Sequence, residues 1–417
     1  MDRIRRFRVV TVVAAGLFLA LPAAPYSVLS HEAVVDTLWT SGFQPALLAR
    51  FPGATPEELI QAHAYAYGGC IIQDMGYYPF GSKLFSDLTH YVRSGDFVEA
   101  LLRDATTLNE YAFALGALVH YAGDNEGHPM ATNRAVPMAY PKLRRKFGAR
   151  VTYENDPLAH LRTEFAFDVV QIAHQHYASD DYHNFIGFEV SKDLLSRAFL
   201  ETYSIDIKKV FSNLDLALGT YRWSVSSVIP TMTKAAWAAH KDEIQRSGSG
   251  ITKRKFLYNM KRSSYEKEWG HAYQRPGVWA RILAFFLRFM PKVGPFRALA
   301  MPSLTAQSQQ LFMASFNATV TRAQSLMNGS RGSGPTLPND NFDTGDPSAP
   351  GKYALADETY VKLLGMLAAN HFAGVSPELR ANILTYCKKP QVLLLSKKTV
   401  EFPKLESELA DLKSLGD

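Results

Sequence analysis

The hydrophobic positions of this chain recur at intervals of three and four residues, which is the spacing of one face of an α-helix. The pattern is clearest in four stretches, residues 56–67, 97–124, 156–177 and 190–213. Few stretches alternate between apolar and polar residues as a half-buried strand does. The pattern therefore predicts a mainly α, multi-helical fold.

Residues 328–351 interrupt the helical pattern, because glycine, serine, proline and aspartate crowd there with few apolar residues. This composition is typical of an exposed loop, and it predicts a flexible linker. The linker would separate a large helical domain, residues 25–327, from a short helical extension, residues 352–417. The sequence indicates no role for the extension.

The N-terminus has the three-part pattern of a secretory signal peptide. Residues 1–8 are basic, residues 9–21 are apolar, and the small residues Ala23 and Ala24 follow. The apolar run is shorter than the roughly 20 residues that span a bilayer. We therefore predict that residues 1–24 are removed and that the protein is exported to the periplasm or the extracellular space.

Composition narrows the partners only slightly. The chain has 417 residues, is 47% hydrophobic and has a formal net charge of +6, so it can bury a large core and favours anionic partners such as phospholipid surfaces or polynucleotides. Its two cysteines, Cys70 and Cys387, are too few for a disulfide-dependent scaffold, and the sequence leaves open whether they are bridged. It gives no indication of an oligomeric state.

Histidines and carboxylates recur four residues apart in two of the helical stretches. His120, Asp124 and His128 follow one another at this spacing, and His160 and Glu164 repeat it. Residues four apart on an α-helix lie one turn apart on the same face, so each pair can reach one cation. Imidazole nitrogen and carboxylate oxygen suit zinc. One such pair often occurs by chance, but the two together predict a site for more than one ion.

Three upstream residues, His31, Asp74 and His90, complete a longer pattern. The order His, Asp, His, His-x3-Asp, His, His-x3-Glu, over roughly residues 26–200, resembles the zinc-dependent phospholipase C family, whose all-helical fold is shared with fungal single-strand nucleases. The resemblance implies a cluster of up to three Zn²⁺ ions and the hydrolysis of a phosphodiester by metal-activated water.

The resemblance also implies which residues hold each ion. The first ion would be held by Asp74, His90, His120 and Asp124, the second by His128, His160 and Glu164, and the third by Asp124, His31 and the mature N-terminal residue, Tyr26. Tyr26 stands five residues before His31, where the nuclease branch has Trp. Asp74 is the implied catalytic residue, either bridging toward the second ion or acting as the general base.

The spacing within the pattern departs from the family at one point. Only three residues separate Asp124 from His128, where the family usually has five. We predict a tight loop there, in which Gly127 bends the chain and Pro129 ends the helix. The proline-containing basic stretch 137–146 then indicates an inserted loop before the second pair.

The substrate and the membrane contact stay open at this stage. A phospholipid substrate is favoured, a single-strand nuclease is the first rival, and a non-catalytic zinc-stabilised binding protein is the second. Met75 replaces the aromatic residue of choline-preferring members, so the headgroup is not fixed. Residues 276–302 are basic and rich in aromatics and Leu. They predict either peripheral membrane contact through an interfacial helix or, more simply, a core helix.

Two sets of neighbouring residues also have alternative interpretations. Asp168 continues the face of the second pair by one turn, so it either orients an imidazole or faces solvent. Tyr77, Tyr78 and Phe80 follow Asp74 and either line a substrate cleft or pack in the core. The histidines outside the pattern are interpreted as ordinary hydrogen-bonded or surface side chains.

Overall fold

The computed structural model describes residues 28–173, 188–225, 302–329, 336–395 and 402–415. These residues form helices joined by short connections, and the strand pairing within them is limited to one isolated bridge between Asp340 and Pro347. The predicted mainly α fold is confirmed.

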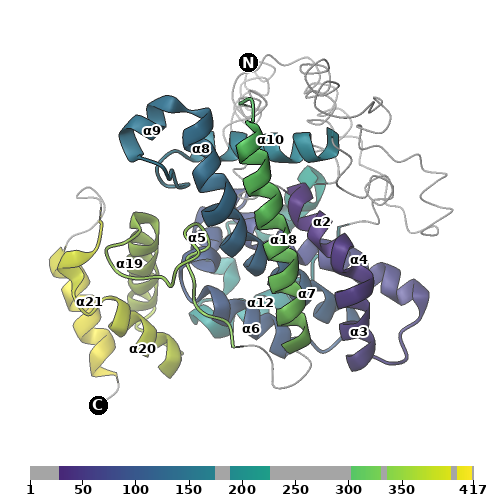
Figure 1. The fold of residues 1–417 in the computed structure, drawn as a ribbon. Coiled ribbons are helices and arrows are strands. Elements are labelled where there is room, and N and C mark those ends of the chain that lie inside the picture. The colour runs from purple at the N-terminus through teal and green to yellow at the C-terminus, as the bar shows by residue number, and fades with distance from the viewer. Residues whose placement is uncertain (1–27, 174–187, 226–301, 330–335, 396–401, 416–417) are drawn as a thin grey trace, which may run out of the picture.

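The helices of the described residues are labelled in Figure 1 where there is room. Their bounds are α2 Val28–Leu38, α3 Gln44–Arg50, α4 Pro56–Gly69, α5 Lys83–Tyr91, α6 Ser94–Asp104, α7 Leu108–Gly127, α8 Asn133–Ala139, α9 Pro141–Phe147, α10 Pro157–Ala173, α12 Lys192–Tyr203, α13 Leu214–Trp223, α18 Ala306–Gly329, α19 Ala354–Ala369, α20 Pro377–Tyr386 and α21 Phe402–Ser414. Tighter or wider helical segments lie between them: η1 Trp39–Phe43, η2 Ile72–Tyr77, η3 His128–Thr132, η4 Ile207–Lys209 and η7 Pro390–Val392.

Helix α7 forms the centre of the bundle. It packs against α4, α6 and α18, and α2 also touches it. Every residue from Tyr111 to Asn125 is buried, so this helix is covered on all sides. A helix that is buried all round is normally apolar. The polar His120 and Asp124 near its C-terminal end are therefore exceptions that need a physical reason.

Two glycines allow α4 and α7 to approach closely. A Cβ atom added to Gly69 would lie 1.9 Å from the carbonyl oxygen of Phe113, and one added to Gly116 would lie 2.2 Å from that of Ala66. Real Cβ atoms do not approach other atoms this closely, so only glycine fits at these two positions. The contact fixes the end of α4 and the turn that follows it against the central helix.

The predicted helical stretches are present, with boundaries set by capping. Residues 97–124 contain two helices, because the chain is extended at Ala105 and at Thr107, whose hydroxyl accepts the Glu110 N–H and caps α7. The stretch 190–213 contains α12, which ends where Ser204 adopts a left-handed conformation, and the short turn η4. The part of 156–177 beyond residue 173 lies outside the described residues.

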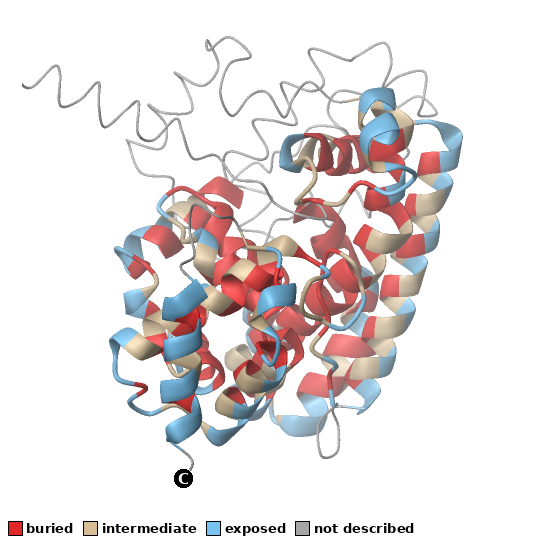
Figure 2. Cartoon of the chain, turned by 90° about the vertical axis from the view of Figure 1, so that its left-hand side faces the viewer, coloured by how far each residue is buried: buried red, intermediate tan, exposed pale blue. Residues whose placement is uncertain are grey.

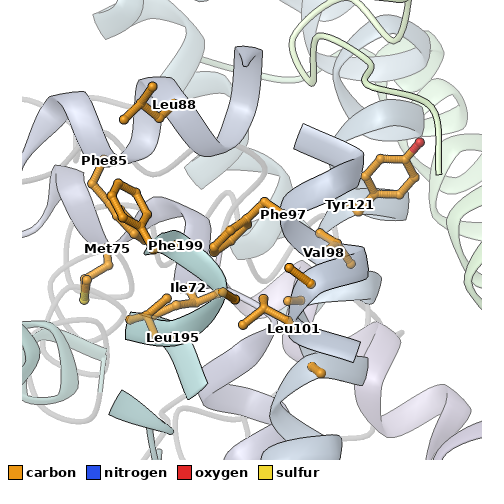
Figure 3. Packing of buried hydrophobic residues seen from close by; sticks show 14 of the residues in the cluster. Ile72, Met75, Phe85, Leu88, Phe97, Val98, Leu101, Tyr121, Leu195 and Phe199 are labelled. Atoms are coloured by element: carbon orange, nitrogen blue, oxygen red, sulfur yellow. The ribbon is translucent and has the colours of Figure 1, made fainter. Parts of the chain in front are cut away.

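A group of large apolar side chains anchors η2 and α5 to α6 and α12 (Figure 3). The ring of Phe85 stacks on Phe199 with centroids 5.5 Å apart and meets Phe97 edge-on at 6.5 Å. Ile72 and Met75 of η2 belong to the same cluster and are fully buried. Burial of each such side chain stabilises the fold by about 1.5–3 kcal/mol. Asp74 lies between these two anchors in the sequence.

The C-terminal helices continue the main core instead of forming a separate one. Helix α19 packs against α5 and α21, and its buried Leu363, Leu364 and Leu367 belong to the same cluster as the residues of α7. The ring of Tyr360 on α19 stacks on Tyr386 of α20 at 3.6 Å. Figure 2 shows buried residues where the helices face one another and exposed residues on their outer sides.

The prediction of an exposed, flexible linker over 328–351 is wrong for the part that the structure describes. Residues 328 and 329 end α18, and Leu337, Phe342 and Asp343 are buried among the helices. The polar side chains that suggested a linker make internal hydrogen bonds: Asn339 Oδ1 accepts the Gly95 and Asp96 N–H groups at the start of α6. Composition alone does not distinguish polar groups bonded to water from polar groups bonded to the protein.

Candidate metal centre

Eight side chains predicted to hold metal lie on six neighbouring elements and converge in the interior. Each is at most 2% exposed. They are His31 on α2, Asp74 on η2, His90 on α5, His120 and Asp124 on α7, His128 at the start of η3, and His160 and Glu164 on α10. The structure thus brings together every predicted ligand that it describes.

Asp124 lies at the centre of the arrangement, with each oxygen facing a different set of imidazoles. Its Oδ2 is 3.2 Å from His120 Nε2 and 3.4 Å from His90 Nε2. Its Oδ1 is 3.2 Å from His31 Nε2 and 3.9 Å from His128 Nε2. This one carboxylate can therefore bridge two cations, as the resemblance implies for the first and third ions.

Asp74 completes the set on the Oδ2 side of Asp124. Its Oδ1 lies 3.2 Å from His90 Nε2 and 4.0 Å from His120 Nε2. Within the described residues, two groups have three donor atoms all within 4.8 Å of one another: Asp74 with His90 and His120, and His31 with His120 and Asp124. Two ligands of a tetrahedral zinc ion lie roughly 3.3 Å apart, given zinc–ligand bonds of about 2.0–2.1 Å. The observed separations suit a shared zinc ion.

Ser86 positions two of these ligands together. Its hydroxyl donates to the carbonyl oxygen of Gln73 at 2.5 Å and accepts the Gly76 N–H at 3.0 Å, which ties η2 to α5. Its main-chain carbonyl oxygen, one turn before His90, lies 2.7 Å from His90 Nδ1. Ser86 therefore fixes the positions of Asp74 and His90 relative to each other.

The remaining three ligands meet at Glu164. Glu164 Oε1 is 3.3 Å from His128 Nε2 and 3.0 Å from His160 Nδ1. His160 and Glu164 are one turn apart on α10, as predicted, while His128 comes from the opposite element η3. In this set each imidazole contacts the Glu164 carboxylate. The three donor atoms are less closely grouped than those of the two groups described above.

The predicted tight loop between Asp124 and His128 is wrong, because the chain stays helical. Gly127 has right-handed helical angles, φ −65° and ψ −51°, and the His128 N–H donates to the Asp124 carbonyl oxygen. Helix α7 then widens into the π-helical turn η3, which accommodates Pro129 near its start. His128 consequently lies one turn beyond Asp124 and still faces the same interior. The predicted inserted loop likewise contains two helices, α8 and α9.

In His90 and His120, the hydrogen bond of the ring nitrogen that faces away from Asp124 shows which nitrogen is available for an ion. His90 Nδ1 faces the Ser86 carbonyl oxygen at 2.7 Å, and His120 Nδ1 faces that of Cys70 at 3.0 Å. A carbonyl oxygen only accepts, so each Nδ1 carries a hydrogen, and Nε2, which faces Asp124, is the nitrogen left to bind an ion. Such outer partners are typical of metal-ligating histidines.

Burial and mutual charge shift the pKa values within the centre. Burial alone would lower the pKa of His90, but contact with Asp124 and Asp74 raises it to about 9. The same balance, with Asp124 and Glu164 as partners, raises the pKa of His128 to about 10. Burial raises the pKa of Asp74 to about 6, and the surrounding imidazoles hold that of Asp124 well below its usual range. Both carboxylates are therefore mainly ionised at neutral pH and can bind a cation.

The buried polar atoms of the centre fit a set of metal ligands. Within the described part of the chain, no hydrogen-bond partner is present for either oxygen of Asp74, Asp124 or Glu164, or for Nε2 of His90 and His120. A buried polar atom without a partner costs about 1–3 kcal/mol, and more if it is charged. So many in one place require a common partner. Divalent cations satisfy imidazole lone pairs and carboxylates at once, and zinc suits this mixture.

Asp168 does not face solvent, which rules out one of its two predicted roles. It is buried, and its two oxygens accept the Leu29 N–H at 3.1 Å and the Ser30 hydroxyl at 2.7 Å. These bonds hold the first turn of α2 against α10. Asp168 therefore positions the helix that carries His31.

The aromatic residues after Asp74 divide between the site and the core. The Tyr77 ring lies 6.1 Å from His90 and 6.0 Å from Tyr153, whose own ring is 5.9 Å from His160. Tyr78 packs edge-on against Tyr221 in the core, and Phe80 is 46% exposed. Tyr77 and Tyr153 thus connect the two donor sets.

Sequence reasoning missed three residues that the fold brings to the centre. The Phe342 ring lies 5.2 Å from His90 and 6.0 Å from His120. Asn133 Oδ1 is 3.0 Å from His160 Nε2, and Asp343 Oδ1 is 3.5 Å from both His128 and His160. The acidic run around Asp343 was a visible signal, but its glycine and proline content favoured a linker.

Some predictions fall outside the described residues. These are the signal peptide 1–24, the N-terminal ligand Tyr26 and, apart from Pro302, the segment 276–302 with its membrane contact. Among the described residues, no helix combines the length and the apolar character needed to cross a membrane. Both cysteines are free and buried in the described structure.

The helical fold and the buried cluster of imidazoles and carboxylates define a class of helical proteins with a candidate metal centre. Residues 30–213 match the family model described as zinc dependent phospholipase C, and all eight described ligands lie in that segment. This segment is similar to the zinc-dependent phospholipase C family. Comparison with curated proteins and with solved structures gave no match. The family is one of hydrolases that act on phospholipids.

Proposed function

We propose that this protein is a zinc-dependent phosphodiesterase that releases the phosphorylated headgroup of a phospholipid, as a phospholipase C does. The proposal is supported mainly by one observation: the cluster around Asp124 lies within the segment that matches the family. The net charge of +6 is in keeping with an anionic substrate surface.

The proposed ligand sets follow the geometry around Asp124 and Glu164. Asp74, His90, His120 and Asp124 Oδ2 would hold one ion, and His128, His160 and Glu164 a second. His31 and Asp124 Oδ1 would hold a third together with Tyr26 at the mature N-terminus. Zinc held by these residues would supply Lewis acidity for the attack of water on a phosphodiester.

Asp74 is the proposed general base. Burial raises the pKa of its carboxyl to about 6, so the group is largely ionised at neutral pH and can accept a proton. Neither of its oxygens has a hydrogen-bond partner among the described residues, so at least one is free to accept a proton. Its contact with His90 supports its assignment to the first ion set.

The experiment compares substrates on one zinc-loaded preparation. Wild-type protein is incubated with vesicles of phosphatidylcholine, phosphatidylethanolamine or phosphatidylglycerol and, separately, with single-stranded DNA. Diacylglycerol release from vesicles supports the proposal, and nucleotide release without diacylglycerol would identify a nuclease instead. Zinc-loaded protein that cleaves neither would refute the enzyme and favour a zinc-stabilised binding protein.

Two variants separate catalysis from folding. Asp74→Asn keeps the shape of the side chain and should abolish diacylglycerol release while the protein stays folded. Asp357→Asn is the matched control, because Asp357 is equally buried but accepts only the Gly351 and Leu394 N–H groups and the Tyr386 hydroxyl. It should lower thermal stability and keep the turnover number.

Export and the N-terminal ligand are proposed together, since Tyr26 can bind zinc through its amino group only after cleavage before it. N-terminal sequencing of the protein secreted by its host would test both. A mature chain that begins at Tyr26 supports the third ion site, and one that retains residues 1–24 contradicts it.

A further inference from the structure

The second ion set has an additional carboxylate that comes from outside the segment matched to the family. Asp343 lies 3.5 Å through its Oδ1 from both His128 Nδ1 and His160 Nε2. These are the opposite ring nitrogens to those that face Glu164. The two imidazoles therefore stand between Glu164 on one side and Asp343 on the other.

The environment of Asn133 shows on which side an ion is held. Its side-chain NH₂ donates to the main-chain carbonyl oxygen of Asp343 at 2.6 Å, which fixes the orientation of the amide. Its Oδ1 then faces His160 Nε2 at 3.0 Å and can only accept. His160 Nε2 must carry the hydrogen, and the lone pair of Nδ1 points to Glu164. The ion consequently lies on the Glu164 side.

The contacts of His128 likewise indicate that it binds the ion on the Glu164 side. Its Nε2 faces both Glu164 and Asp124, the centre of the cluster, while its Nδ1 faces only Asp343 among the carboxylates in contact with it. A carboxylate beside a ring nitrogen favours hydrogen on that nitrogen and leaves the other nitrogen to bind metal.

Asp343 is itself firmly held. Its Oδ2 accepts the Tyr153 N–H at 2.9 Å and the hydroxyl of Tyr353, and its own N–H donates to Asn341 Oδ1 at 3.0 Å. Its Oδ1 is buried and has no hydrogen-bond partner in the described part of the chain. One oxygen therefore anchors the side chain and the other is directed at the two imidazoles.

We propose that Asp343 is a positioning residue of the metal centre, which holds His128 and His160 with their metal-binding nitrogens toward Glu164. The C-terminal segment that carries it completes a site whose ligands all lie before residue 165. The inference rests on the proposed zinc centre and not on the identity of the substrate.

The test measures zinc affinity directly, by competition with a chromophoric chelator, together with zinc content by mass spectrometry. Asp343→Asn should weaken one zinc site about 10- to 100-fold, the usual effect of losing an outer partner of a metal-ligating histidine. At saturating zinc the variant should still bind as many ions as the wild type.

The matched control is Asp340→Asn. Asp340 lies in the same segment as Asp343, between α18 and α19, and is buried. Its Oδ2 contacts the Tyr121 hydroxyl and Arg322 instead of the imidazoles. It should leave the zinc affinity unchanged. Equal losses in the two variants would show that only docking of the segment matters, and an Asp343→Asn variant with wild-type affinity would overturn the proposal outright. Permanent loss of one ion at saturating zinc would make Asp343 a ligand and also overturn it.

A measurement on the wild type avoids dependence on a variant that folds poorly. In zinc-loaded protein labelled with ¹⁵N-histidine, long-range ¹H–¹⁵N spectra report which ring nitrogen is protonated. The proposal requires hydrogen on Nδ1 of His128 and on Nε2 of His160, and the reverse at either residue overturns it. Zinc-loaded wild type that cleaves no phosphodiester would refute the proposed function while these readouts still decide the role of Asp343.

Discussion

The two halves of the metal centre are built in different ways. Around Asp124, the Nδ1 atoms of His90 and His120 are held by main-chain carbonyl oxygens, that of Ser86 one turn earlier in the same helix and that of Cys70 at the end of α4. Around Glu164, those of His128 and His160 face the side chains of Asn133 and Asp343, the latter from a segment near residue 340.

This difference has a consequence for stability. Main-chain partners are supplied by any sequence that forms the helices, whereas side-chain partners depend on particular residues and on docking of a distant segment. The Asp124 half should therefore tolerate substitution around its ligands better than the Glu164 half. Asp124, the carboxylate that two ion sets share, should tolerate substitution least.

The largest effect is expected at the bridging carboxylate. Asp124→Asn removes the charge that faces four imidazoles, so both ion sets that share it should weaken. Zinc content should fall by at least one ion per chain, and diacylglycerol release should drop by more than about 100-fold, beyond the range for an outer partner. Full zinc content with full activity would show that Asp124 is not shared.

A second, smaller effect should appear where α2 meets α7. A Cβ atom at Gly123 would lie 2.8 Å from Cε1 of His31, so Gly123→Ala must displace that ring. The variant should lose the ion held by His31, keep the ion beside Asp74, and lose about 1–3 kcal/mol of unfolding free energy.

Gly219→Ala serves as the control for that variant. Gly219 is on helix α13 and is exposed, with nothing within 4 Å of an added Cβ. The substitution should stabilise the protein by up to about 1 kcal/mol, because alanine favours helix more than glycine does. Thermal melts with metal analysis would compare the two, and identical zinc contents would count against a role for His31.

Zinc affinity should rise with pH in both halves. Contacts with carboxylates raise the pKa of His90 to about 9 and that of His128 to about 10, although burial opposes both shifts. At neutral pH a zinc ion must therefore displace a proton from each imidazole, and affinity falls as pH falls. Between pH 6 and 9 the affinity should increase about tenfold per pH unit for each proton displaced.

Calorimetry in buffers of different ionisation enthalpy counts the released protons. Release of about one proton from each half is expected near pH 7. Affinity that is flat or falls with rising pH would mean that these imidazoles are not ligands.

The smallest effect is expected where the docked segment meets α6, away from the imidazoles. Asn339→Ala leaves the Gly95 and Asp96 N–H groups without their acceptor, which should cost about 1–2 kcal/mol of unfolding free energy. Zinc content and affinity should stay at wild-type values. A loss of zinc as large as that in Asp343→Asn would show that packing of the whole segment, and not the Asp343 side chain, determines zinc binding.

The sequence predicted the helices and two pairs of candidate ligands from short-range spacing. His120 with Asp124 and His160 with Glu164 are one helical turn apart, so their geometry follows from the helix itself. The upstream ligands His31, Asp74 and His90 came from the resemblance to a family, since nothing in their spacing places them together.

The residues that the sequence failed to predict depend on long-range contacts. Asn133 and Asp343 are distant from their imidazole partners in the sequence, and hydrogen bonds such as that from Asn133 to the Asp343 carbonyl form only in the folded chain. The helical continuation through Gly127 was missed for a related reason. The π-helical turn accommodates Pro129, which the sequence alone suggests should end the helix.

The most direct test of the central claim is an anomalous-difference map at the zinc edge from crystals of the zinc-loaded protein. The account predicts separate peaks between Asp74 and Asp124 and beside Glu164, with Asp343 outside the ligands of the latter. Zinc found only away from these carboxylates, or no peak between them, would contradict it.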